Sequence, residues 1–135
     1  MYKKEFDEWN NDKKILAFCD NKKVYPKTRH IYYIKLGVNI GFESDGKIRF
    51  LRPVLVLAKL GSLFWVVPLT SKRKEGVFYH KITSVSFKGK RSSFIMLTQS
   101  RVVDRLRFQN EIGIMKKEEY FEIQKKMMKL YFPSI

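Results

Sequence analysis

Two long apolar stretches near the middle of the chain dominate its pattern of hydrophobic and polar positions. They cover Leu51–Ala58 and Leu63–Ser71, are rich in β-branched and aromatic residues, and are separated by a short segment with a glycine. Runs of this length, joined by a turn, predict two adjacent antiparallel strands. Because nearly every side chain in them is apolar, we expect a central strand pair that is buried on both faces.

The polar residues of this strand pair gather at one end. Arg52 is near the start of the first strand, and Thr70 and Ser71 end the second. In an antiparallel hairpin the start of one strand lies beside the end of the next. We therefore expect a guanidinium and two hydroxyls at one rim of the sheet, which makes this rim a candidate site.

Shorter strand patterns flank the central pair, and a helical pattern closes the chain. Further strands are predicted at His30–Leu36, Val77–Thr83, Ser84–Phe87 and Ser93–Gln99, and Glu111–Ile114 is interpreted as a short strand or a bend. From Lys116 to Tyr131 apolar residues recur at helical spacing, which predicts an amphipathic helix whose stripe packs on the core or forms a dimer contact. Short strands ending in a helix, without βαβ alternation, predict a mostly β (α+β) fold. An SH3-like antiparallel barrel with a C-terminal helix is the natural candidate.

The first part of the chain has a different pattern. Tyr2, Phe6, Trp9 and Leu16 fall roughly on one helical face, and a turn and an extended linker follow. We interpret residues 1–27 as an N-terminal helical extension and linker, and 28–135 as the barrel domain. The aromatic residues of the extension are interpreted as packing anchors and not as ligand contacts.

Charge and residue content narrow the function. The chain has 135 residues, with 28 Lys and Arg against 13 Asp and Glu, for a net charge of +15. This excess favours phosphate-rich or otherwise acidic partners, although solvated surface lysines would give the same total. Basic turns at Lys72–Gly76 and Lys88–Arg91 could form one stripe or separate solvated tips, and the sequence favours neither.

Several classes of site and location are not expected. Cys19 is the only cysteine, and His30 and His80 are the only histidines, so a structural zinc site or a Cys/His nucleophilic pair lacks members. No close carboxylate cluster suggests a metal mechanism, and we expect no cofactor. Neither a signal-peptide pattern nor an apolar run long enough for a membrane span is present, which predicts a cytoplasmic protein.

Several motifs occur together in the order that one protein family shows. They are Leu36–Glu43, Asp45–Gly46, Arg52–Leu57, Val67–Ser71 and Ser93–Leu106. In this combination the chain resembles the MazF/PemK family, the toxin halves of type II toxin–antitoxin systems. The resemblance implies an SH3-like barrel, a homodimer, an acidic protein antitoxin, and metal-independent cleavage of single-stranded RNA at a short sequence.

The resemblance also implies roles for particular residues. The usual catalytic pair of the family corresponds to Arg52 and Thr70, and a glutamate that affects activity in some members corresponds to Glu43. Some members use an acid just before the motif glutamine. This chain has Thr98 there, so that variant of the mechanism is not expected.

The chemistry of RNA cleavage can be matched to these residues. Attack by the 2′-hydroxyl needs a base, positive charge for the transition state, and a proton for the leaving 5′-oxygen. Arg52 could supply the charge through its N–H donors. Thr70 and Ser71 could hydrogen-bond the phosphate or orient the 2′-hydroxyl. Glu43, on a predicted long hairpin loop at 37–50, is a candidate base, and Arg52 itself stays a second one.

Binding of the RNA is assigned to basic and aromatic residues around the rim. The expected phosphate contacts are Lys47, Arg49, Lys72 and Arg73, and the residues expected to read or stack bases are Gln99 and Phe42. Phe42 could equally be barrel packing. Two other functions stay open: a non-enzymatic toxin that inhibits a nucleic-acid enzyme such as gyrase, and a plain RNA-binding barrel.

Overall fold

The computed structural model describes residues 8–10, 13, 24–36 and 51–134. The strands are β1 His30–Lys35, β2 Leu51–Leu60, β3 Leu63–Thr70, β4 Tyr79–Lys81, β5 Phe94–Met96, β6 Arg101–Asp104 and β7 Phe108–Ile114. Two 3₁₀ turns, η1 Leu97–Gln99 and η2 Arg105–Arg107, flank β6, and the helix α2 spans Lys117–Tyr131. The loop predicted at 37–50, most of the N-terminal extension, and Cys19 lie outside the described residues.

The central strand pair is confirmed as β2 and β3. These strands are antiparallel, with Val54 opposite Pro68 and Leu60 opposite Leu63, and Gly61 in the turn has a φ of 70°. A positive φ is readily adopted by glycine, which explains its place in this tight connection. Apart from the ends next to the turn, both strands are mostly buried, as their continuous apolar runs predict.

The two faces of this pair belong to different hydrophobic clusters. Leu55 and Val67 pack in one cluster, together with Ile123 and Met127 of α2. Val54 and Val66 belong to a second cluster, with Phe64 and Phe108, inside the curve of the sheet. Neighbouring residues of a strand point to opposite faces. The runs are therefore apolar throughout because each face covers a core of its own.

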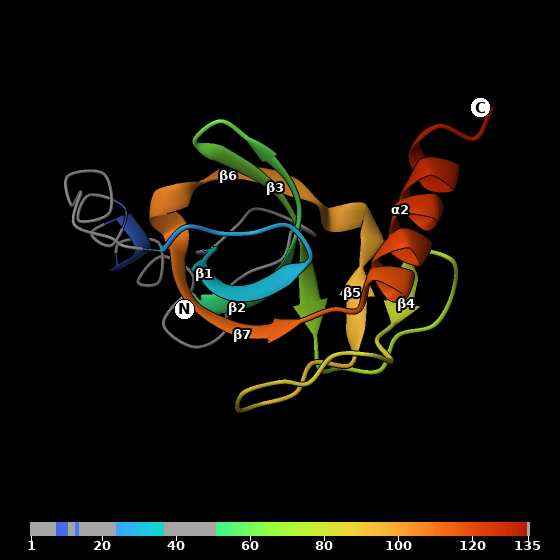
Figure 1. The fold of residues 1–135 in the computed structure, drawn as a ribbon, viewed down its shortest axis with the longest axis horizontal. Helices are drawn as coiled ribbons and strands as arrows, with labels where there is room; N and C mark the ends of the chain where they lie inside the picture. The colour runs from blue at the N-terminus through green and yellow to red at the C-terminus, as the bar shows by residue number, and fades with distance from the viewer. Residues whose placement is uncertain (1–7, 11–12, 14–23, 37–50, 135) are drawn as a thin grey trace.

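The strands form one strongly curved antiparallel sheet in the order β4-β5-β3-β2-β1-β7, with β6 paired to β3 (Figure 1). Strand β3 divides the sheet: its first half pairs with β6, and its end pairs with β5. Every pairing among the described strands is antiparallel. The mostly β fold with a C-terminal helix is confirmed, although the strands of the described residues do not close into a complete barrel.

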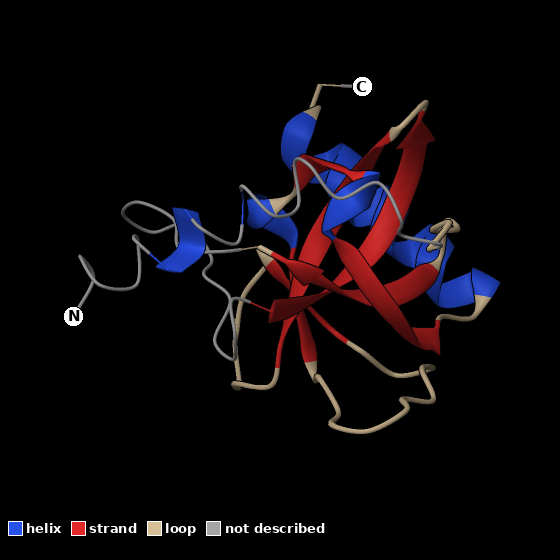
Figure 2. Cartoon of the chain, turned by 90° about the vertical axis from the view of Figure 1, so that its left-hand side faces the viewer, coloured by secondary structure: helices blue, strands red, loops and turns tan. Residues whose placement is uncertain are grey.

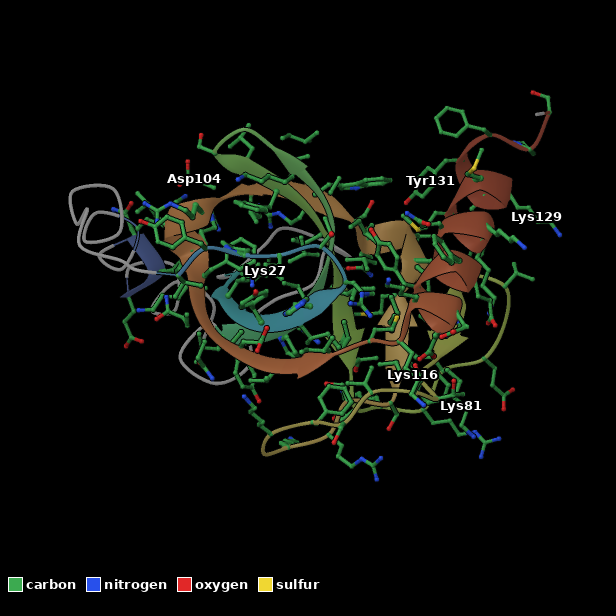
Figure 3. All side chains as sticks on the ribbon, viewed as in Figure 1. Lys27, Lys81, Asp104, Lys116, Lys129 and Tyr131 are labelled. Atoms are coloured by element: carbon green, nitrogen blue, oxygen red, sulfur yellow. The ribbon has the colours of Figure 1, made fainter. Side chains whose placement is uncertain are left out.

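The C-terminal helix lies against one side of the sheet, as Figure 2 also shows. Tyr120, Ile123 and Met127 are buried, which confirms the predicted stripe as core packing. The hydroxyl of Tyr131 donates to the carbonyl of Leu97 over 3.0 Å. In Figure 3 Tyr131 lies on the side of α2 towards the sheet and Lys129 on the opposite side. No helix in the described parts of the chain is long and apolar enough to cross a membrane.

Some strand predictions were too long, and one was wrong. Val77–Thr83 shortens to β4, and Ser93–Gln99 shortens to β5 because Leu97–Gln99 turns into η1. Ser84–Phe87 is not a strand. The amides of Thr83 and Ser84 donate to the side chain of Glu119 over 2.8 and 2.9 Å, and not to a neighbouring strand. This contact is invisible to local β propensity, because Glu119 comes from the distant helix.

The N-terminal extension contacts the domain through two arginines of η2. Trp9 lies in a short helical segment, is buried, and has the guanidinium of Arg107 5.5 Å from its ring centre. Arg105 lies 5.1 Å from the ring centre of Tyr25 and donates to the carbonyl of Val24 over 3.3 Å. These contacts fit the interpretation of Trp9 as a packing anchor. The division of the chain at residue 27 stays a prediction.

Candidate functional site

The register of β2 and β3 brings Arg52 and Thr70 together. Val54 is opposite Pro68, and Arg52 and Thr70 are each two residues beyond this pair, at the same end of the hairpin. The Nη1 of Arg52 donates to the carbonyl oxygen of Leu69, the neighbour of Thr70, over 3.3 Å. The predicted meeting of a guanidinium and a hydroxyl at one end of the hairpin is therefore present.

Both residues are more buried than a strand end suggests. Arg52 is 8% exposed and Thr70 is 4% exposed. They nevertheless line a pocket of about 300 Å³, with Ser71 beside them. The remaining lining residues are Tyr33, Leu51, Pro53, Leu69, Lys90, Arg91 and Ser92. A guanidinium at low exposure, next to an open pocket, is poorly screened by water and acts more strongly on a bound anion.

The hydrogen bonds of Thr70 fix its orientation. Its hydroxyl oxygen accepts from the amide of Lys72 over 3.2 Å, and its carbonyl accepts from the amide of Ser93 over 2.9 Å. A threonine hydroxyl can accept and donate at the same time. Because the backbone occupies the hydroxyl as an acceptor, its hydrogen is available to donate to a ligand in the pocket.

All charged side chains among the described lining residues of the pocket are basic. Arg52, Lys90 and Arg91 are basic, and Thr70, Ser71 and Ser92 contribute hydroxyls. No acidic side chain is among the described residues that line the pocket. Guanidinium, ammonium and hydroxyl donors together suit an anionic ligand, above all a phosphate oxygen.

Four lining residues with polar groups in their side chains were missed by the sequence analysis as members of the site. Lys90 and Arg91 were visible as a basic turn, but the sequence did not connect that turn to Thr70. The connection is made by the Ser93 amide and by the pairing of Phe94 with Thr70. No sequence signal identified Ser92 or Tyr33, which lies in the middle of the apolar strand β1.

Other predicted residues are not part of this pocket. Lys72 and Arg73 are exposed on the turn after Ser71, and Arg73 forms a 3.3 Å ion pair with Glu75. Gln99 ends η1, is half-buried, and does not line the pocket. The other predicted residues, Phe42, Glu43, Lys47 and Arg49, lie outside the described residues.

A second polar cluster is buried where α2 meets the sheet. The Nε2 of His80 is 2.7 Å from Oε2 of Glu119, and Lys126 Nζ is 2.8 Å from His80 Nδ1. The hydroxyl and amide of Ser84 and the amide of Thr83 also donate to the Glu119 carboxylate. Burial by itself raises the pKa of Glu119, but the hydrogen bonds from Ser84, His80 and Thr83 outweigh it and lower this pKa to about 2.

A resident metal ion was not expected from the sequence. In the portion of the chain that the structure describes, no group of three His, Cys, Asp or Glu side chains is arranged to hold one. The chemistry that can be built from the described pocket residues is therefore anion binding and hydrogen-bond donation by arginine, lysine and hydroxyl groups.

Known structures share this fold. MazF from Deinococcus radiodurans superposes with a TM-score of 0.66 at 21% identity, over 80% of this chain and 97% of that one. A MazE–MazF complex from the same organism gives 0.62 at 18% identity, over 82% and 98% of the two chains. An endoribonuclease in complex with its cognate antitoxin, from a mycobacterial species, gives 0.59 at 11% identity, over 82% and 100%.

Sequence comparison gives the family. Among curated proteins no sequence matches this chain. The sequence profile of the PemK-like, MazF-like toxins of type II toxin–antitoxin systems, however, matches residues 27–131, which is most of the chain. This range includes the central hairpin, all lining residues of the pocket, and α2. The chain therefore belongs to the PemK-like, MazF-like family of type II toxin–antitoxin toxins.

Proposed function

We propose that this protein is a metal-independent, sequence-specific endoribonuclease toxin that cleaves single-stranded RNA. The 2′-hydroxyl of the substrate attacks the adjacent phosphorus, the bond to the 5′-oxygen breaks, and a 2′,3′-cyclic phosphate remains. The observation that carries the proposal is the shared pocket of Arg52 and Thr70, which has basic and hydroxyl lining groups and no acidic one among the described residues.

Arg52 is the group best suited to stabilise the transition state. Its guanidinium is held by the Leu69 carbonyl and lines the pocket at low exposure. Negative charge builds up on the phosphate oxygens as the fifth bond forms. A cation that is already oriented towards that position needs no reorganisation when the charge develops.

The hydroxyl groups have a positioning role in this proposal. Thr70 can donate its hydrogen to a phosphate oxygen or to the attacking hydroxyl because Lys72 N–H already occupies its oxygen. Ser71 lines the same pocket. Glu43 and Arg52 both stay candidates for the base. Arginine keeps its proton in proteins, which favours the carboxylate of Glu43 for this step.

The proposal includes the partners that go with a toxin of this family. An acidic antitoxin would complement the net charge of +15 and compete with RNA for the basic pocket. The structural neighbours that contain MazE bound to MazF support an antitoxin partner. A homodimer, action in the cytoplasm, and RNA contacts from Lys47, Arg49, Lys72, Arg73, Gln99 and Phe42 belong to the same proposal.

Cleavage of RNA in excess EDTA is the direct test. We expect the pure protein to cut single-stranded RNA at a recurring short sequence and to leave cyclic phosphate ends, which end-labelling and mass spectrometry would detect. Arg52→Ala should slow cleavage by roughly 100-fold to 1000-fold, the usual loss when an oriented transition-state donor is removed. Lys59→Ala, an exposed position at the other end of β2, is the matched control.

The outcomes separate the three candidate functions. Loss of cleavage in EDTA, restored by a divalent cation, would reject the metal-independent mechanism. Intact RNA together with inhibited supercoiling would identify an inhibitor of a nucleic-acid enzyme. Salt-dependent binding of RNA that is recovered at full length would identify a binding barrel. A thermal unfolding midpoint of Arg52→Ala near that of the wild type would show that lost activity does not reflect lost folding.

A further inference from the structure

Two basic turns follow the β2–β3 hairpin in the chain, and they differ in their relation to the pocket. The first basic turn, Lys72–Gly76, comes directly after Ser71. The second basic turn, Lys88–Arg91, lies further along, between β4 and β5. Sequence proximity pointed to the first turn as the phosphate contact. The lining of the pocket includes Lys90 and Arg91 and no residue of the first turn.

The second basic turn is attached to the sheet on both sides. At its start the amide of Lys88 donates to the carbonyl of Ile112 in β7 over 2.8 Å. Just after its end the amide of Ser93 donates to the carbonyl of Thr70. Gly89 has a φ of 90°, a conformation that permits the sharp reversal between these two attachments. Figure 1 shows this segment below the arrowhead of β3.

The charges of the two turns also differ in how they are compensated. In the first turn Arg73 pairs with Glu75, and Lys74 Nζ lies 5.8 Å from the ring centre of Tyr79. The second turn has three basic residues and no acid. Within the described part of the chain neither Lys90 nor Arg91 takes part in an ion pair or a hydrogen bond. Both are exposed.

We infer that Lys90 and Arg91 form a phosphate-binding subsite, which holds a backbone phosphate of the RNA next to the one being cleaved. The inference rests on the proposed RNA substrate. Arg52 and Thr70 lie at the buried side of the pocket, and the second basic turn forms a wall that is anchored directly to the backbone of Thr70. An RNA chain whose scissile phosphate contacts Arg52 would then pass its neighbouring phosphate along Lys90 and Arg91.

This subsite acts on binding and not on the chemical step. Because each cation that contacts a phosphate adds to the affinity, losing both cations should weaken RNA binding roughly tenfold or more. Each phosphate contact to single-stranded nucleic acid changes the slope of log affinity against log salt by about 0.7. The subsite therefore predicts a higher KM, an unchanged kcat, and a shallower salt dependence when its charges are removed.

The test compares two double variants that lose the same charge. Lys90→Gln/Arg91→Gln removes the second turn's pocket cations, and Lys125→Gln/Lys129→Gln removes two exposed cations of α2 that do not line the pocket. Fluorescence anisotropy with a 2′-O-methylated single-stranded RNA, which cannot be cleaved through its 2′-oxygen, gives Kd at several salt concentrations. We expect the first variant to lose about tenfold in Kd and to have the shallower salt slope, and the second to lose about threefold or less.

Each outcome separates this subsite from the proposed ribonuclease activity. Equal losses in the two variants would overturn the subsite, because general charge would then explain the binding, even if the wild type cleaves RNA. A lower kcat at unchanged KM in Lys90→Gln/Arg91→Gln would also overturn it. If the wild type binds but does not cleave RNA, the ribonuclease proposal fails, and a selective loss of binding in this variant would still support the subsite. Weakened binding of an acidic antitoxin peptide with unchanged RNA binding would reject it.

Discussion

The molecule contains two buried polar clusters that differ in the charges around them. In the pocket, Arg52 and Thr70 are 8% and 4% exposed, and their surroundings add positive charge without a described acid. In the cluster under α2, His80 and Glu119 are 2% and 5% exposed, and each charged group faces a partner from the chain itself. Ion pairing and hydrogen bonds connect the groups of the second cluster to one another, whereas the described lining of the first is basic and hydroxyl-rich and borders open space.

This difference shows why an unusual pKa is a weak guide to a functional site. Glu119 has the strongly lowered pKa, yet its carboxylate is occupied by donors from Ser84, His80 and Thr83. Structural networks shift pKa values as catalytic sites do. What distinguishes the pocket is a described lining of basic and hydroxyl groups without an acid, next to open space. The cluster under α2 is therefore interpreted as a structural connection between the helix and the segment after β4.

The largest expected effect comes from a variant of the cluster under α2, and it is a loss of protein stability. Glu119→Gln removes the negative charge that His80 and three other donors contact, and leaves those donors without a full set of acceptors. Breaking a buried charged network in this way should lower the free energy of unfolding by about 3 kcal/mol. Chemical denaturation monitored by circular dichroism would measure it.

A neighbouring glutamate gives the matched control for this variant. Glu118 is exposed in the first turn of the same helix, so Glu118→Gln should cost about 0.5 kcal/mol or less through the helix dipole. Cleavage per folded molecule should be unchanged in both variants. A folded Glu119→Gln protein that binds RNA but no longer cleaves it would contradict the interpretation of the cluster under α2 as purely structural.

The next effect concerns the pocket. Thr70→Val keeps the shape of the side chain but removes the hydroxyl, and it should slow cleavage by about 100-fold. The lost acceptor for Lys72 N–H should cost about 1 kcal/mol of stability. Single-turnover cleavage assays and thermal unfolding would measure the two effects separately. Thr70→Ser, which keeps the hydroxyl, should retain most of the activity, and equal losses in Ser and Val would argue against a hydroxyl role.

The smallest effect is the acid sensitivity of the cluster under α2. The pKa of Glu119 is lowered from 4.5 to about 2 in the folded protein, so its contribution to stability is present above pH 4.5 and is lost as the pH falls towards 2. Between pH 7 and pH 3.5 the wild type should lose about 1.5 kcal/mol more than Glu119→Gln does. Parallel denaturation curves at these pH values would test this, and parallel losses in both proteins would contradict it.

The sequence identified much of the fold because local signals and global packing agree there. The runs Leu51–Ala58 and Leu63–Ser71 gave the central strands, and the stripe of the last helix gave its buried face. The strand assigned to Ser84–Phe87 is absent, and at its start the amides of Thr83 and Ser84 bond to Glu119, a partner that local propensity does not contain. The predictions at 37–50, including Glu43, lie outside the described residues.

For the candidate site, the chain by itself determined that Arg52 would lie beside the Thr70–Ser71 end of the next strand, since a hairpin places the start of one strand next to the end of the other. The register shift between Val56 and Ala58, which the structure alone shows, moves the alignment of this end by one residue, from Ser71 towards Thr70. Only the tertiary structure decided that Lys90, Arg91, Ser92 and Tyr33 join them. These residues reach the pocket through the pairing of β1 with β2 and of β5 with β3, and the sequence does not state which strands become neighbours. Pairing between distant segments depends on how all the apolar faces are covered at once, and this is a property of the whole folded chain.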